Sequence, residues 1–178
     1  MSGLRFIIGY DLEEFEPYYL SLNDLHTFYR TRGLRETAIN EFGEDERGHI
    51  ESNPDHLIVW MVQDQIVGHT VWHETSTDEM TAGDPRYKED RAILRKLFGG
   101  KRENLVELHE VWLRTEHRGK KHGHRFLEFF EDFVREKGFD GIVYYSDDVA
   151  AVALCRRRGY AEAFLEKERW HVFVKLLT

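Results

Sequence analysis

The spacing of apolar residues changes several times along the chain, and each change marks a structural element. Residues 57–62 are all apolar, which predicts a strand buried on both faces. Residues 66–73 alternate in character after a polar turn at 63–65, so the two segments predict a β-hairpin. Between residues 121 and 137, apolar side chains recur with the spacing of an amphipathic helix. Further strands are predicted at 6–10, 105–113, 141–145 and 170–176, and further helices at 22–29, 34–42, 88–98 and 149–158.

The order of these elements predicts the fold class. Helices come first, a β-hairpin follows, and the chain then runs β-α-β-α-β. We expect a single α/β (α+β) domain over residues 1–178, with a mixed, mostly antiparallel sheet and helices on both faces. Residues 10–50 supply the N-terminal helices. Residues 74–104 are polar, contain one helix, and are long for a hairpin connection, so they are interpreted as an insertion.

The composition excludes several classes of protein. No apolar run approaches the roughly 20 residues that a membrane span needs, and the first residues lack the pattern of a secretory signal. Cys155 is the only cysteine among 178 residues, which excludes an intrachain disulfide and favours the cytoplasm. The formal net charge of -8 disfavours nucleic acid as a partner and favours a cationic one.

A basic turn with two glycines, between a predicted strand and the long helix, gives the main chemical indication. It reads Arg118-Gly119-Lys120-Lys121-His122-Gly123-His124. The first N–H groups of a helix have no partner within the helix, and the helix dipole places partial positive charge there, so such a turn suits a polyphosphate. The turn is neither a Walker loop nor a dinucleotide-binding fingerprint. Taken alone, it is equally consistent with an ordinary basic loop.

Ten histidines stand out in the composition, and His117, His122 and His124 lie within eight residues. A metal site needs further ligands at suitable geometry, and the sequence identifies none beside this turn. We therefore expect no metal and interpret the three histidines as part of an anion site. His69 and His73 share a strand face, where a metal pair is conceivable, although hydrogen-bonded core or rim histidines are the commoner outcome.

Two segments together resemble the GNAT superfamily of N-acetyltransferases. The acyl-CoA motif of that family, [RQ]-x-x-G-x-[GA], falls on residues 118–123 and matches at Arg118 and Gly123. A downstream motif, N-x-x-A-x-x-L-Y-x-x-x-G-[FY], begins at Asp148 and matches at Ala151, Leu154, Gly159 and Tyr160. The resemblance extends over about residues 55–178 and agrees with the predicted order of elements.

The resemblance implies that acetyl-CoA is the cosubstrate. The backbone of Trp112 and Leu113 would bind the pantetheine arm and the acyl carbonyl, and Asp148 would lie near the pantetheine. The pyrophosphate would be held by Arg118, Gly119, Lys120, Lys121, His122, Gly123 and His124. Three positions depart from the family: Lys121 replaces a glycine, Asp148 replaces an asparagine, and Cys155 replaces the tyrosine often assigned as general acid.

The predicted reaction is direct attack of a substrate amine on the thioester, which requires a base. The strand before the turn offers Glu107, His109 and Glu110, and by resemblance the family takes its base from this strand. Glu107 and His109 share a face because strand side chains alternate, so they are favoured as the base pair, with Glu110 third. Each is alternatively a solvated or ion-paired strand residue. Cys155 either protonates the leaving thiolate or packs as an inert apolar group.

The leading functional hypothesis is an acetyl-CoA-dependent N-acetyltransferase acting on a primary amine of a small molecule or a peptide. The alternative is a catalytically silent acyl-CoA-binding regulatory module, suggested by the altered glycine and the missing tyrosine. A nucleic-acid-binding role for residues 117–125 and 156–158 is disfavoured by the charge of -8, and no membrane partner is expected. The segment 74–104 and the last strand are candidate homodimer surfaces.

Overall fold

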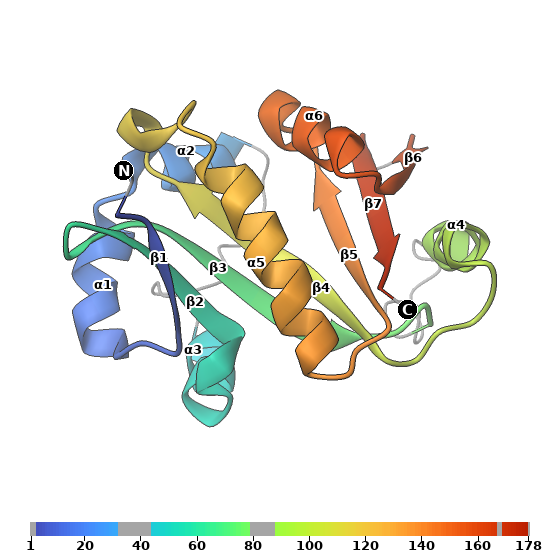
Figure 1. Ribbon diagram of the computed structural model, residues 1–178, viewed down its shortest axis with the longest axis horizontal. Coiled ribbons are helices and arrows are strands. Elements are labelled where there is room, and N and C mark those ends of the chain that lie inside the picture. The colour runs from blue at the N-terminus through green and yellow to red at the C-terminus, as the bar shows by residue number, and fades with distance from the viewer. Residues whose placement is uncertain (1–2, 32–43, 79–87, 167–168, 178) are drawn as a thin grey trace. The chain divides into compact units, whose positions relative to one another are not determined.

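The computed structural model describes residues 3–31, 44–78, 88–166 and 169–177 (Figure 1). The predicted helix at 34–42 lies outside these residues. In the described part of the chain no helix is long and apolar enough to cross a membrane. The strands are β1 (Arg5–Ile8), β2 (Leu57–Val62), β3 (Gln65–Thr75), β4 (Leu105–Leu113), β5 (Gly141–Ser146), β6 (Ala161–Leu165) and β7 (Trp170–Leu176). The helices are α1 (Leu12–Leu20), α2 (Asn23–Thr31), α3 (Glu44–Ser52), α4 (Lys88–Phe98), α5 (His122–Glu136) and α6 (Val149–Arg157), with short 3-10 turns η1 (Pro54–His56) and η4 (Thr115–His117).

The seven strands form a sheet in the order β1-β2-β3-β4-β5-β7-β6. Antiparallel pairing joins β1 to β2, β2 to β3, β5 to β7 and β6 to β7. Strands β4 and β5 are parallel because helix α5 carries the chain back between them. The predicted mixed, mostly antiparallel sheet with flanking helices is therefore confirmed.

Contacts divide the chain into two compact units, which strands β3 and β4 both enter. The first comprises Met1–Trp72 and His109–His122, and the second comprises His73–Leu108 and Gly123–Thr178. The core of the first unit is formed by side chains from α1, α2, α3, β2 and β3, namely Phe15, Tyr18, Tyr19, Leu22, Leu25, Tyr29, Ile50, Leu57, Val59, Met61 and Val71. The early helices of the sequence therefore pack on the β2–β3 hairpin.

Helix α1 was not predicted, because Pro17 lies inside it. An interior proline removes a helical hydrogen bond and costs about 3 kcal/mol. The Asp11 side chain caps the helix by accepting a hydrogen bond from the Glu14 N–H at 2.9 Å. Burial of Phe15, Tyr18 and Tyr19 contributes more, since full burial of one such side chain is worth roughly 1.5–3 kcal/mol. Tertiary packing thus outweighs the unfavourable local sequence.

The predicted hairpin is confirmed, and its turn has a clear backbone cause. Gln63 and Asp64 have φ angles of 48° and 61°. Two successive left-handed residues match the right-handed twist of the strands that they join. Residues 57–61 are all buried, as predicted for a strand covered on both faces. Strand β3 extends two residues beyond the predicted end at residue 73.

In the second unit, α5 buries the predicted apolar stripe, and α4 packs on the sheet. Phe126, Leu127, Phe130, Phe133 and Val134 are at most 8% exposed. Helix α4, predicted inside the 74–104 insertion, contacts β6 and β7 through a core of Leu94, Phe98, Leu105, Val143, Leu165, Val172 and Val174. Strand β6 was not predicted, because most of its residues are exposed and its apolar and polar residues do not alternate regularly.

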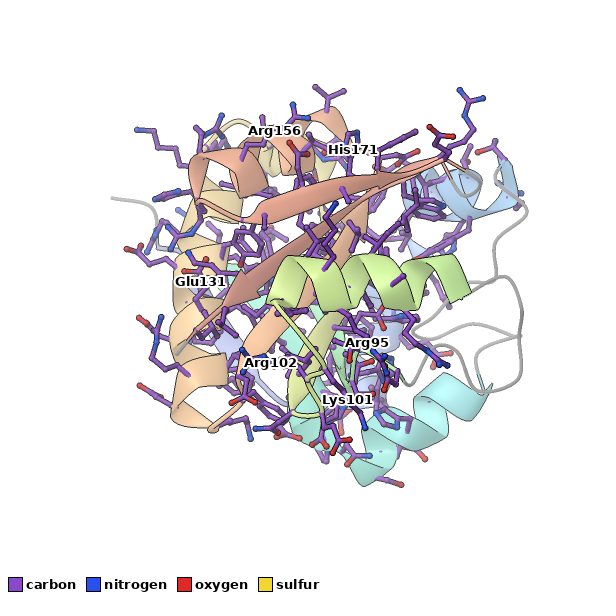
Figure 2. All side chains as sticks on the ribbon, turned by 90° about the vertical axis from the view of Figure 1, so that its right-hand side faces the viewer. Arg95, Lys101, Arg102, Glu131, Arg156 and His171 are labelled. Carbon is purple, nitrogen blue, oxygen red and sulfur yellow. The ribbon has the colours of Figure 1, made fainter. Side chains whose placement is uncertain are left out.

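Ion pairs join the elements of the second unit. Near the ends of the insertion, the Thr77 N–H donates to the Arg102 carbonyl at 2.9 Å, and Arg95 of α4 donates to both carboxylate oxygens of Asp78. Arg156 and His171 both contact Glu162, and Figure 2 shows these two side chains at the end of the unit away from Lys101. These pairs are largely exposed, and each contributes little to stability.

The pair between Glu131 and Arg158 is different, because Glu131 is only 4% exposed. Its carboxylate accepts two hydrogen bonds from Arg158, one from the Tyr160 hydroxyl, and an ion pair from Lys175 at 3.2 Å. Burial acts to raise the pKa of Glu131, but the hydrogen bonds from Arg158 and Lys175 outweigh it and hold that pKa below its usual value. The carboxylate therefore stabilises the fold only while it is ionised.

We predict that Glu131→Gln lowers the free energy of unfolding by roughly 3 kcal/mol at pH 7, because it leaves buried cations without their anion. Glu162→Gln, which breaks an exposed pair, is the matched control and should cost less than about 1 kcal/mol. Urea denaturation measures both. The Glu131 contribution should be complete above the unfolded-state pKa of about 4.3 and disappear as the pH falls through the lower folded-state pKa. Equal losses in the two variants would contradict this assignment.

Candidate active site

The turn between β4 and α5 has the backbone of a glycine-rich loop although it contains a lysine at a central position. Gly119 and Lys121 have φ angles of 76° and 63°. Lys121 stands where the motif of the sequence resemblance has a glycine, so its left-handed conformation explains why glycine suits this position. A non-glycine residue pays about 1–2 kcal/mol there. The lysine is exposed and adds a cation to the turn.

The turn leads directly into a helix of 15 residues that begins at His122. Lys120, Lys121 and His124 are exposed around the helix start, and His122 is buried with its ring stacked 6.3 Å from that of His117. Free helix N–H groups, partial dipole charge and two lysines at one point suit a phosphate. Within the second unit, a β-carbon added to Gly123 would lie 3.2 Å from Leu154 Cδ2, so α5 and α6 approach closely here.

Arg118 differs from the simple expectation of a phosphate ligand. Its Nε donates to the Leu113 carbonyl at 2.9 Å, its guanidinium lies 3.5 Å from Asp24 of α2, and it stacks over the Trp112 ring at 5.0 Å. In this arrangement Arg118 fixes the end of β4 against the turn. No sequence pattern indicates the Asp24 contact, because it joins residues far apart in the chain.

The end of β4 is held unusually close to β3. The Arg114 N–H donates to the Val67 carbonyl at 2.8 Å. A β-carbon at Gly68 would lie 2.8 Å from the Trp112 carbonyl oxygen and 3.2 Å from Leu113 Cδ1, so glycine is required for this approach. The buried Trp112 Nε1 has no hydrogen-bond partner among the described residues. Glycine at position 68 therefore sets how closely β3 approaches the segment Trp112–Leu113.

A buried carboxylate, Glu110, forms the centre of a polar network inside the first unit. Glu110 is 4% exposed. One carboxylate oxygen lies 2.5 Å from His69 Nε2. The other accepts a hydrogen bond from the Tyr29 hydroxyl and faces the Tyr19 hydroxyl at 3.5 Å. The far ring nitrogen of His69, Nδ1, lies 2.9 Å from the Tyr18 hydroxyl.

These contacts are consistent with one arrangement of protons. A proton on His69 Nε2 faces the Glu110 carboxylate, which leaves Nδ1 to accept a hydrogen bond from the Tyr18 hydroxyl. Burial raises the pKa of Tyr18 well above its usual value, although the guanidinium of Arg114, 5.0 Å from the ring, opposes the shift. Tyr18 thus stays a neutral phenol that can accept one proton while it donates another.

Tyr18 also lines a surface pocket of about 380 Å³ in the first unit. Arg114, Glu116 and His117 supply its charged and polar walls, and residues 65–67 of β3 complete it. Tyr18 therefore contacts both the pocket and the Glu110–His69 pair. Tyr18, Tyr19 and Tyr29 were not among the site residues expected from the sequence.

The predicted base residues divide between the two faces of β4. Glu107 is half-buried and His109 is exposed, and alternation places both on the face opposite Glu110. The structure thus joins Glu110, ranked third from the sequence, to the His69 network. The base role of Glu107 and His109 stays a prediction.

Cys155 and Asp148 lie in the second unit, on α6. The Asp148 side chain accepts a hydrogen bond from the Ala151 N–H at 2.9 Å and so caps the start of α6. Cys155 is fully buried, and burial, with Glu131 and Glu162 nearby, raises the pKa of its thiol to about 12. Arg156 and Arg158 of the same segment are engaged by Glu162 and Glu131.

We predict that the free energy of unfolding of Lys121→Gly exceeds that of Lys121→Ala by about 1 kcal/mol, because only glycine relieves the left-handed strain. The neighbouring Lys120 is not among the residues with positive φ, so Lys120→Gly should be less stable than Lys120→Ala. Thermal unfolding of the four variants measures both differences. The same sign at both positions would rule out a backbone cause.

Comparison with known proteins identifies the family. No significant match is found among curated protein sequences. Among solved structures, the mosquito arylalkylamine N-acetyltransferase-like 5b is 19% identical with a TM-score of 0.63, covering 98% of this chain and 100% of its own. The Drosophila melanogaster polyamine N-acetyltransferase that forms N-acetylagmatine is 16% identical with a TM-score of 0.59 over 98% and 100% of the two chains. N-acetylglutamate synthase from Neisseria gonorrhoeae, solved with coenzyme A and N-acetylglutamate, is 12% identical with a TM-score of 0.60 and matches all of this chain with 36% of its own. The model of the acetyltransferase (GNAT) family matches residues 19–160, and the chain therefore belongs to the GNAT acetyltransferase family.

Proposed function

We propose that the protein is an acetyl-CoA-dependent N-acetyltransferase that transfers the acetyl group to a primary amine by direct attack on the thioester. The observation that carries this proposal is the turn at 118–121. Its left-handed Gly119 and Lys121 stand directly before the 15-residue helix α5, in a chain of the acetyltransferase family. The coenzyme A seen in the N-acetylglutamate synthase of similar fold supports the choice of cosubstrate.

Acetyl-CoA would be bound by the continuous segment from the end of β4 to the start of α5. The backbone of Trp112 and Leu113, which Gly68 of β3 approaches closely, would bind the pantetheine arm and the acyl carbonyl, as the family resemblance implies. The helix start and its lysines suit the pyrophosphate. The Leu113 N–H would stabilise the oxyanion of the tetrahedral intermediate.

Removal of a proton from the amine is the main chemical obstacle. An alkylammonium group with a pKa of about 10.4 is over three units too protonated at pH 7, a cost of roughly 4–5 kcal/mol. We propose that Tyr18, His69 and Glu110 accept this proton. Tyr18 receives it, directly or through water, as its own hydroxyl proton passes to His69 Nδ1. The imidazolium that forms faces the Glu110 carboxylate, as in other imidazole–carboxylate pairs.

The acceptor would be a small cationic amine. The pocket beside Tyr18, about 380 Å³, has a size suited to a small molecule. Glu116 and Arg114 in its wall offset each other, so the attraction for a cation rests on the net charge of -8 of the whole chain. The arylalkylamine and polyamine enzymes of similar fold are named for amines of this class. The proposal places the acceptor on the N-terminal helices, since Tyr18 lies in α1.

The buried thiol of Cys155, with a pKa of about 12, is a weak acid for protonating the departing CoA thiolate. Transfer of its proton to a thiolate with a pKa of about 8.5 is unfavourable by roughly 5 kcal/mol. We therefore propose that Cys155 packs in the core beneath α6 and that the CoA thiolate leaves without a proton from Cys155.

A silent acyl-CoA-binding module remains the alternative function. The cytoplasm stays the proposed location, on the ground of the single cysteine.

The variant Glu110→Gln should lower kcat/KM for an amine at pH 7 on the order of 100-fold, the scale of one acid–base catalyst, and leave acetyl-CoA affinity unchanged. The deficit should shrink as the pH approaches the amine pKa, where less ammonium needs deprotonation. Glu107→Gln and His109→Gln, on the other face of β4, test the competing base pair expected from the sequence, and both should retain near-normal rates if the Glu110 network accepts the proton. Tyr18→Phe keeps the ring and should reproduce the Glu110→Gln profile. A loss confined to Glu107→Gln would instead make Glu107 the base.

The placement of the pyrophosphate predicts that Gly123→Glu abolishes acetyl-CoA binding measured by calorimetry, because a carboxylate would stand at the helix start. Gly123→Ala controls for the 3.2 Å approach of Leu154 and should bind within about threefold of the wild type, as a one-methyl intrusion is usually tolerated at small cost. Normal affinity in Gly123→Glu would show that the pyrophosphate lies elsewhere.

A further inference from the structure

One donor to the buried Glu110 carboxylate lies outside the proposed proton path. Tyr29, in the last turn of α2, donates a hydrogen bond from its hydroxyl to Glu110 Oε2. The other oxygen, Oε1, lies 2.5 Å from His69 Nε2. Tyr29 is 8% exposed and Glu110 is 4% exposed, so solvent has little access to either group. The two oxygens of one buried carboxylate are therefore directed at two different elements, α2 and β3.

Tyr19 of α1 approaches the same oxygen as Tyr29 but provides a much weaker contact. Its hydroxyl lies 3.5 Å from Glu110 Oε2, outside the range of about 2.5–3.0 Å that is usual for hydrogen bonds between oxygens. A hydrogen bond to an ionised group is roughly twice as strong as one between neutral groups. Tyr29 therefore supplies most of the stabilisation that Oε2 receives from the two tyrosines.

Contacts at the other end of α2 hold the helix against the chain that follows β4. The Asp24 carboxylate accepts a hydrogen bond from the Thr115 hydroxyl at 3.0 Å and lies 3.5 Å from the guanidinium of Arg118. Leu25 and Tyr29 bury one face of α2 in the core of the first unit. The position of the Tyr29 hydroxyl is thus fixed by the packing of α2 as well as by the hydrogen bond that it makes.

We infer that Tyr29 is a positioning residue for the proposed reaction and acts through Glu110. The inference rests on the proposed function, in which His69 takes up a proton beside the Glu110 carboxylate. With Oε2 held by Tyr29, Oε1 faces His69 Nε2 and keeps the proton of the neutral ring on that nitrogen. Nδ1 then keeps the lone pair that accepts the hydrogen bond from Tyr18. The Tyr29 hydroxyl also favours the charged form of the carboxylate, because it donates to it.

Removal of this hydroxyl changes the proton affinity of the Glu110–His69 pair in one direction. In Tyr29→Phe the carboxylate loses its nearer tyrosine donor on Oε2, so it binds a proton more tightly. The free enzyme would then hold a proton on the pair up to a higher pH and could not accept another from the amine. Other titratable and charged groups beside the pair or its tyrosines stay unchanged in this variant, namely Tyr18, Tyr19, Asp24, His26 and Arg114.

The test measures kcat/KM of the full chain against pH for one amine, so the ionisation of the amine is common to all variants. The lower limb of this profile reports a group of the free enzyme. Tyr29→Phe should move that limb up by about one pH unit, or roughly tenfold in proton affinity, as expected for the loss of one hydrogen bond to a charged group. Acetyl-CoA affinity, measured by calorimetry, should stay unchanged. Incorporation of 3-fluorotyrosine at position 29 makes the hydroxyl a stronger donor and should move the limb the opposite way.

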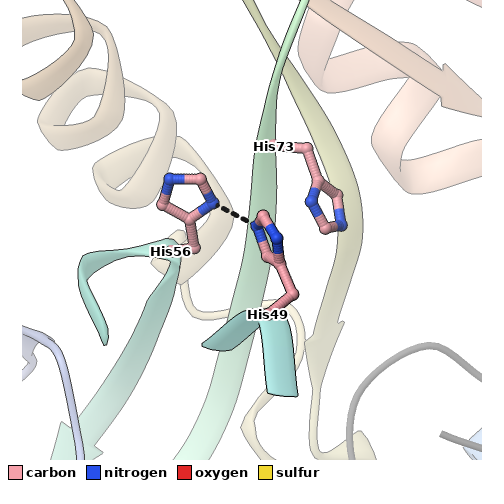
Figure 3. Close-up of side chains that lie close together, drawn as sticks. All are labelled: His49, His56 and His73. Carbon is pink, nitrogen blue, oxygen red and sulfur yellow. Dashed lines mark hydrogen bonds between the residues drawn. The ribbon is translucent and has the colours of Figure 1, made fainter. Parts of the chain in front are cut away.

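Two variants control for general effects on stability. Tyr19→Phe removes the hydroxyl that lies 3.5 Å from the same carboxylate oxygen, and it should keep the wild-type profile. His49→Ala removes the hydrogen bond between His49 Nε2 and His56 Nδ1 at 2.8 Å, drawn as the dashed line in Figure 3. These two histidines belong to α3 and η1, while the residues of the Glu110 network belong to α1, α2, β3 and β4. This variant should therefore keep the wild-type profile as well.

A Tyr29→Phe profile that coincides with that of the wild type would overturn the inference. The same shift in Tyr19→Phe or His49→Ala would also overturn it, as would a loss in Tyr29→Phe that is equal at every pH, because each indicates a purely structural role. Should Tyr29→Phe fail to fold, the 3-fluorotyrosine protein decides the question, and a limb that does not move contradicts the inference. The proposed function fails in a different way, with no amine-dependent release of thiol by the wild type at any pH, and the inference falls with it.

Discussion

The buried carboxylate of Glu110 is the constraint on which the first unit depends. A carboxylate that is 4% exposed within an aromatic core is unfavourable unless hydrogen-bond donors surround it. Here the donors come from α1, α2 and β3, through Tyr19, Tyr29 and His69. Satisfying one acid therefore fixes three other elements around the middle of β4. The same requirement accounts for why tyrosines, rather than phenylalanines, occupy these core positions of the N-terminal helices.

Beyond Glu110, backbone geometry determines how the end of β4 is positioned. Gly68 lets β3 approach the Trp112 carbonyl, and the left-handed residues of the following turn bring the chain into α5. Both features lie at adjacent points of one continuous segment of the chain. We propose that the backbone at the end of β4 and the start of α5 bind the cosubstrate. The buried network of Tyr18, His69 and Glu110 accepts the proton of the amine.

Much of the fold was predictable, because in long periodic segments the spacing of apolar residues indicates which face is buried. The apolar stripe of α5 and the β2–β3 hairpin both follow from local sequence. Helix α1 was not predictable, since Pro17 opposes it locally and only tertiary burial supports it. The site shows the same limit. The basic turn is contiguous and was found, whereas the contact between Tyr18 and His69 spans 51 positions and leaves no pattern in the sequence.

The central claim is that this chain transfers an acetyl group to an amine. The most direct measurement is release of free CoA thiol from acetyl-CoA by the full chain, with and without a panel of small cationic amines that includes agmatine and polyamines. The account predicts saturable, amine-dependent thiol release, with an equal amount of acetylated amine detected by mass spectrometry. Tight acetyl-CoA binding without thiol release for any amine would contradict it and favour a silent acyl-CoA-binding module.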